Sequence, residues 1–128
     1  MVKKYKLNEI DSFISKVLKS LLFEMVPEYA KDYAEEDVSE EGIYLFMNDF
    51  AMDLGTELSV DNSSRFVKNA FKYINLLGES NNLEILNIVT VGILEILYST
   101  EFLNRNMVSG LLCEKLKIRF NNFSDYYQ

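Results

Sequence analysis

Carboxylates form the densest group of chemically capable side chains in this sequence. Five acids fall within seven residues, namely Glu35, Glu36, Asp37, Glu40 and Glu41. Oxygen ligands of this kind bind hard metal ions, and a pair of carboxylates can act as general acid and base. The spacing supports neither use, because an EF-hand loop alternates its acids around a central glycine and this run does not. A solvated face or a contact for a partner remains as the interpretation of these acids.

Other catalytic chemistry lacks its usual residues. Histidine is absent, which removes Ser-His-Asp and Cys-His arrangements, imidazole ligands for zinc and the commonest general base. The single cysteine, Cys113, has no second thiol to pair with, and we expect it to fill the core. No glycine-rich phosphate loop occurs. We therefore expect no enzyme, no cofactor and no metal; a small enzyme that uses carboxylates is the third-ranked alternative.

Charge is concentrated in one part of the chain. The whole sequence has a net charge of −7, residues 1–23 carry +3, residues 24–61 carry −11 and residues 62–128 carry +1. Twelve acids against Lys31 alone produce the excess in the middle part. Such a concentration disfavours nucleic acid or anionic lipid as a direct ligand and favours a basic protein partner.

Length and composition indicate one globular domain. The 128 residues, of which 48% are hydrophobic and 26% charged, suffice for a single core without disulfides or metal. We expect one domain over 1–128 with a flexible tail at 1–7. The start has no signal-peptide pattern, and the most apolar stretch, Leu83 to Tyr98, is too polar and short to span a membrane. A cytoplasmic location is expected.

Hydrophobic periodicity predicts an all-α fold, a single-domain bundle of five to six helices. The expected helices cover residues 9–25, 27–36, 40–54, 65–77, 83–97 and 105–120. Pro27 suits the first helical position, Ser39 can cap the third helix, and Gly55 and Gly78 are placed as stops. Glu57 and Leu58 offer an alternative in which the third helix extends past Gly55. The β-branched run at 88–93 leaves a strand as the minority interpretation. The predicted core contains Phe46, Phe50, Phe71, Ile74, Leu86, Val89 and Leu97.

Two helices of this bundle offer a contact surface. Tyr29 and Tyr33 are one turn apart, beside a carboxylate row; we expect one ring to pack in the core and leave the other open. Leu45 and Met52 lie opposite the core side of the next helix, where either a partner or another helix can cover them. The candidate partner-binding residues are Tyr29, Asp32, Tyr33, Glu36, Asp37, Glu40, Glu41, Leu45, Asp49, Met52 and Asp53.

Two stretches also resemble a family of small helical bacterial proteins. The first contains Met25-Val26-Pro27-Glu28-Tyr29, Tyr33-Ala34-Glu35-Glu36, Gly42 and Leu45-Phe46-Met47-Asn48-Asp49-Phe50; the second contains Phe71-Lys72-Tyr73-Ile74-Asn75, Asn87-Ile88-Val89 and Val91-Gly92-Ile93-Leu94-Glu95. Members resemble immunity proteins of polymorphic or contact-dependent growth inhibition toxin systems. The resemblance implies a small cytosolic protein that neutralises a cognate toxin, often a nuclease. It implies no catalytic residue, and no contact residue follows from it because toxin contacts vary.

Charge and resemblance lead to the same functional prediction. A nuclease needs a basic groove for phosphates, and an acidic helical face can occupy or cover that groove. The predicted function is stoichiometric blockade of a basic toxin domain, expected to be a nuclease. The alternative is a structural or regulatory helical module that oligomerises through Leu45, Met52 and the aromatic tail, with acidity serving only solubility.

Overall fold

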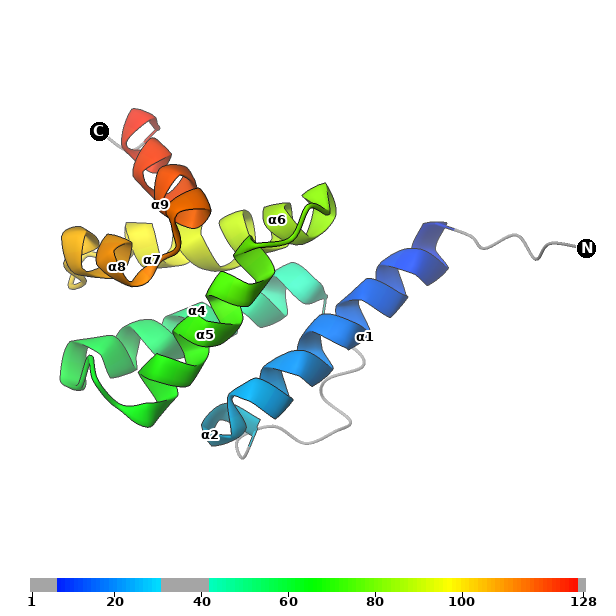
Figure 1. Ribbon diagram of the computed structural model, residues 1–128, viewed down its shortest axis with the longest axis horizontal. Coiled ribbons are helices and arrows are strands. Elements are labelled where there is room, and N and C mark those ends of the chain that lie inside the picture. Colours follow the sequence, from blue (N-terminus) through cyan, green and yellow to red (C-terminus); the bar gives the residue numbers. More distant parts are fainter. Residues whose placement is uncertain (1–6, 31–41, 127–128) are drawn as a thin grey trace, which may run out of the picture.

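The computed structural model describes residues 7–30 and 42–126, and all regular elements in these ranges are helical. Six α-helices of seven residues or more occur there. The all-α prediction is confirmed for this part of the chain. α5 occupies the middle of the arrangement and contacts α1, α2, α4, α6 and α9 (Figure 1).

The N-terminal helices agree with the sequence pattern. α1 (Leu7–Met25) begins slightly earlier than predicted, at the last residue of the expected tail, and residues 1–6 lie outside the described range. α2 (Pro27–Ala30) starts at the proline, as predicted. Its expected extension to Glu36 falls outside the described residues.

α4 (Ile43–Val60) starts later than predicted and continues past Gly55 at its other end. Its N-cap is Gly42 rather than Ser39, so the predicted cap is wrong for this helix. Gly55 lies inside the helix instead of ending it, so the alternative in which Glu57 and Leu58 extend the helix is confirmed. The helix continues because the next turn buries Leu58, which is 4% exposed, and burial of a leucine outweighs the cost of about 1 kcal/mol for a helical glycine.

α5 (Arg65–Gly78) starts as its sequence indicates, but Gly78 has a different role from the one predicted. The Ser64 hydroxyl caps the first turn by accepting a hydrogen bond from the Val67 amide at 3.2 Å. Gly78 is not a left-handed cap, since the described residues contain no glycine with positive φ. A Cβ there would lie 2.5 Å from Cγ of Leu116. The glycine is required because α9 packs against the end of α5.

Residues 83–99 form one continuous helical segment, so the helical prediction is confirmed and the strand alternative is wrong. It comprises α6 (Leu83–Val89), the π-helical turn η1 (Thr90–Leu94) and α7 (Glu95–Ser99). The sequence did not predict the π-helical turn. A Cβ at Gly92, within this turn, would lie 2.8 Å from Cβ of Met47 on α4, so the two backbones approach closely.

The C-terminal segment is two helices instead of the one predicted at 105–120. α8 (Arg105–Leu111) and α9 (Glu114–Asn121) are separated at Leu112 and Cys113, and the short 3-10 helix η2 (Asn122–Asp125) follows. Asn75 on α5 bridges the break: its amide donates to the Leu111 carbonyl at 3.0 Å and accepts from the Cys113 amide at 2.8 Å. These bonds satisfy backbone groups that a continuous helix would pair internally.

The core prediction is confirmed residue by residue. All seven predicted core residues are buried, none more than 5% exposed. An aromatic cluster joins the first three helices to α5: the Phe50 ring lies 5.1 Å from that of Tyr29 and 6.1 Å from that of Tyr73 between centroids. The Tyr73 hydroxyl donates to the Leu18 carbonyl at 2.8 Å, and burial raises the pKa of Tyr73. This cluster holds α1, α4 and α5 together.

Candidate partner-binding surface

The structure describes five of the eleven candidate contact residues, Tyr29, Leu45, Asp49, Met52 and Asp53. The other candidates, Asp32, Tyr33, Glu36, Asp37, Glu40 and Glu41, lie outside the described residues, and their role stays a prediction. In the sequence they directly precede Gly42 and α4. The described part of the site is therefore the outer side of α4.

Tyr29 belongs to the core and not to a contact surface. Its side chain is 1% exposed, and its ring packs edge-on against Phe50 and Phe66. The expectation that one of the two tyrosines packs inward is met by Tyr29, and its inclusion among the partner-binding residues is wrong. A buried ring cannot reach a partner without unpacking the cluster.

The outer side of α4 combines apolar side chains with carboxylates. Leu45 is 58% exposed and Met52 is 52% exposed, so none of the described helices covers them. Asp49 is half-buried and Asp53 is exposed. Because these two acids are four residues apart, they lie one above the other on a row beside the apolar pair. Exposed apolar groups next to charge are typical of binding surfaces.

A second helix extends this surface, and the sequence interpretation missed it. The Tyr44 side chain lies beside Glu84 at the start of α6, close enough for the carboxylate to act on its hydroxyl. Partial burial first, and then this carboxylate, raise the pKa of Tyr44. With its amide oriented to satisfy its neighbours, Asn48 donates to the Gly92 carbonyl at 2.8 Å and to that of Tyr44 at 3.3 Å. These contacts place residues 83–99 alongside α4. The available sequence signal was Gly92, a small residue within an otherwise bulky apolar run.

α4 and residues 83–99 carry acidic side chains and no basic ones. Within 43–60 and 83–99 the acids are Asp49, Asp53, Glu57, Glu84 and Glu95, and neither stretch contains a lysine or an arginine. α5 and α9, in contrast, carry three basic residues each. Charge separation of this kind produces an oriented field that attracts a basic partner to one side of a protein.

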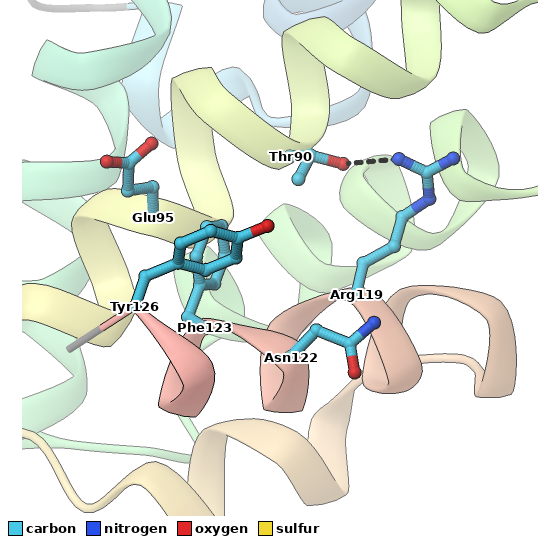
Figure 2. Close-up of a pocket in the computed structure, with 6 residues that line it drawn as sticks. All are labelled: Thr90, Glu95, Arg119, Asn122, Phe123 and Tyr126. Atoms are coloured by element: carbon cyan, nitrogen blue, oxygen red, sulfur yellow. Dashed lines mark hydrogen bonds between the residues drawn. The ribbon is translucent and has the colours of Figure 1, made fainter. Parts of the chain in front are cut away.

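A cleft lies on the other side of residues 83–99, between them and the C-terminal segment. It has a volume of about 450 Å³ and is lined by Thr90, Glu95, Arg119, Asn122, Phe123 and Tyr126 (Figure 2). Nη1 of Arg119 donates to the Thr90 hydroxyl at 3.2 Å. The hydroxyl in turn donates to the Leu86 carbonyl at 2.7 Å. Figure 2 shows the Glu95 carboxylate turned away from this pair, so among the six side chains drawn no carboxylate faces the Thr90 hydroxyl.

The described residues contain no group of three or more His, Cys, Asp or Glu side chains that could hold a metal ion. The acids at 35–41 lie outside them. Cys113 is half-buried at the N-cap of α9, which agrees only in part with a core filler. None of the described helices is long and apolar enough to cross a membrane.

Comparison with known proteins gives a family and little else. Residues 16–128 match a family model described as "Domain of unknown function (DUF7674)". The match covers most of the chain, so the protein belongs to this family. No curated protein and no solved structure matches the chain. The family description names no activity, ligand or partner.

Proposed function

We propose that this member of the DUF7674 family is an immunity protein, which binds a basic bacterial toxin domain through the outer side of α4 and blocks it stoichiometrically. The observation that carries the proposal is the combination on α4 of exposed Leu45 and Met52 with the row formed by Asp49 and Asp53. The acids of residues 32–41, directly before α4 in the sequence, extend the same charge. The resemblance of residues 25–50 and 71–95 to immunity proteins supports the proposal independently.

The mechanism divides between charge and apolar contact. Carboxylates around the rim attract the basic toxin and raise the association rate. Leu45 and Met52, desolvated in the complex, slow dissociation. A nuclease is the toxin class with the clearest need for a basic groove, because its substrate is a polyanion. The protein itself performs no reaction in this proposal and acts in the cytoplasm, where the toxin arrives.

The test uses the toxin domain encoded beside the gene for this protein. Co-expression should protect cells from that domain, and binding should be measured in a salt series. Asp49→Lys with Asp53→Lys should slow association by about tenfold or more at low salt and less at high salt, because screening weakens rim charges. The matched control is Glu79→Lys with Glu101→Lys, which changes net charge equally at exposed positions outside α4 and residues 83–99.

Two outcomes would count against the proposal. Equal association rates for the two folded double variants would remove α4 from the contact. Absence of both protection and binding for every toxin domain encoded nearby would remove the immunity function.

The second candidate function is a helical module that oligomerises, and the same exposed apolar residues favour it, together with Tyr126 in the aromatic tail, which is 81% exposed. Sedimentation equilibrium distinguishes the two. A concentration-dependent dimer that Met52→Asp returns to monomer would favour the module, whereas a monomer at all concentrations would favour the immunity protein.

A further inference from the structure

An apolar strip runs along the junction between α4 and residues 83–99. Tyr44, Leu45 and Met52 contribute to it from α4 with exposed fractions of 37%, 58% and 52%. Val91, which directly precedes the Gly92 contact, adds a side chain that is 47% exposed. From Tyr44 to Met52 the strip spans about 12 Å, or slightly more than two helical turns.

The two helices run side by side in the same direction, which makes the strip continuous. Tyr44 meets Glu84 near their first turns, and Asn48 meets Gly92 in the middle. Near the other end, a Cβ at Gly55 would lie 3.9 Å from Cδ2 of Leu97. Gly92 permits the close approach in the middle of the pair, where an added Cβ would lie 2.8 Å from Cβ of Met47, while the contact at Gly55 is an ordinary van der Waals distance.

Carboxylates border the strip on both helices. Asp49 and Asp53 form the row on α4, and Glu84 lies at the start of residues 83–99, whereas Glu95 lines the cleft beside the C-terminal segment. Neither of these two stretches contains a lysine or an arginine. A second copy of this chain would bring carboxylates against carboxylates, and like charges across an interface are unfavourable. The charges therefore favour a partner segment that has an apolar face with positively charged residues on both sides of it.

We infer that this strip receives an amphipathic helix of the partner, with apolar residues along the junction of the two helices and lysines or arginines facing the acids on either side. This mode of recognition presents anchors of the bound helix at intervals of three and four residues. The inference rests on the proposed function and specifies it, because it adds Glu84 and Val91 to the contact and names the partner element.

The test uses the intact protein and a defined probe, a synthetic helical peptide of about 18 residues of leucine and lysine, long enough to form a helix on binding. Its control is a scrambled peptide of the same composition without an apolar face. In ¹⁵N-labelled protein, the helical peptide should shift the amide signals of residues 44–56 and 84–95 and the scrambled peptide should not. Shifts spread over α5 and α9, or equal shifts with both peptides, would overturn the inference.

Variants then locate the strip. Met52→Asp and Val91→Asp should each weaken binding of the helical peptide by about tenfold or more, because each places a charge in the apolar contact. Leu76→Asp is the matched control, since Leu76 is 50% exposed but lies on α5, and it should leave affinity unchanged. If Val91→Asp has no effect while Met52→Asp does, the two-helix strip is refuted. Protection of cells from the toxin is measured separately, and it tests the proposed function independently of the result of the peptide-binding experiment.

Discussion

At the level of single residues, Gly78 shows how one missing methyl group determines the packing of two helices. Its Cα faces Leu116, whose Cγ, Cδ1 and Cδ2 would all lie within 3.0 Å of an added Cβ. Leu116 is fully buried on α9, so it has little space into which to move. Steric contact, and not backbone conformation, makes glycine necessary at this position.

Gly78→Ala should therefore destabilise the protein by about 1–3 kcal/mol, the usual cost of overpacking a core. The control is Gly110→Ala in α8, where an added Cβ meets nothing within 4 Å, and which should stabilise by about 0.4–1 kcal/mol. Urea unfolding of both variants measures the difference. Equal effects of the two alanines would contradict the packing argument.

At the level of elements, the break between α8 and α9 depends on one side chain from another helix. Asn75 is half-buried on α5 and pairs with both the Leu111 carbonyl and the Cys113 amide. Those two backbone groups flank the turn where the chain changes direction. An amide side chain suits this position because it carries a donor and an acceptor on one carbon.

Asn75→Ala should cost about 1–3 kcal/mol, because it leaves backbone groups at the junction without partners. Asn87→Ala, an exposed asparagine on α6, is the control and should change stability by less than about 0.5 kcal/mol. Hydrogen exchange should show faster exchange of the Cys113 amide in Asn75→Ala. Unchanged exchange there would mean that the turn persists without the bridge.

At the level of the whole molecule, stability comes from a shared aromatic and aliphatic core. Phe50 is fully buried and packs against rings from α2 and α5. Phe50→Ala should cost about 3–5 kcal/mol, measured by thermal or urea unfolding with Phe102→Ala, at a position 63% exposed, as control. A loss for Phe50→Ala no larger than for Phe102→Ala would contradict this core.

We also predict, at the level of the whole molecule, that folding does not depend on a metal ion. The melting temperature should not change when EDTA is added, because the proposed function involves no metal ion. A metal bound only by the folded state would stabilise that state, and its removal by EDTA would lower the melting temperature. Differential scanning calorimetry with and without the chelator measures this. A decrease of more than a few degrees would restore the alternative in which the acids of residues 35–41 hold a metal.

The sequence by itself determined the class of fold and most of its core. Apolar residues at intervals of three and four predicted helices over 9–25, 65–77 and 83–97 and placed Phe46, Phe50 and Ile74 inside. The prediction of these helices succeeds because a helix buries one apolar stripe against its neighbours, and the spacing of apolar residues in the local sequence determines that stripe. The concentration of acids in residues 24–61 is likewise a property of the sequence alone.

Tertiary structure decided what depends on contacts between distant segments. The break at Leu112 and Cys113 needs Asn75, Gly78 is explained only by Leu116, and Tyr29 is assigned to the core by its contacts with Phe50 and Phe66. The pairing of α4 with residues 83–99, which adds Val91 and Glu84 to the candidate surface, follows from Met47 and Gly92. Periodicity indicates that a helix has a buried side, but the element that covers that side is set by packing across the whole chain.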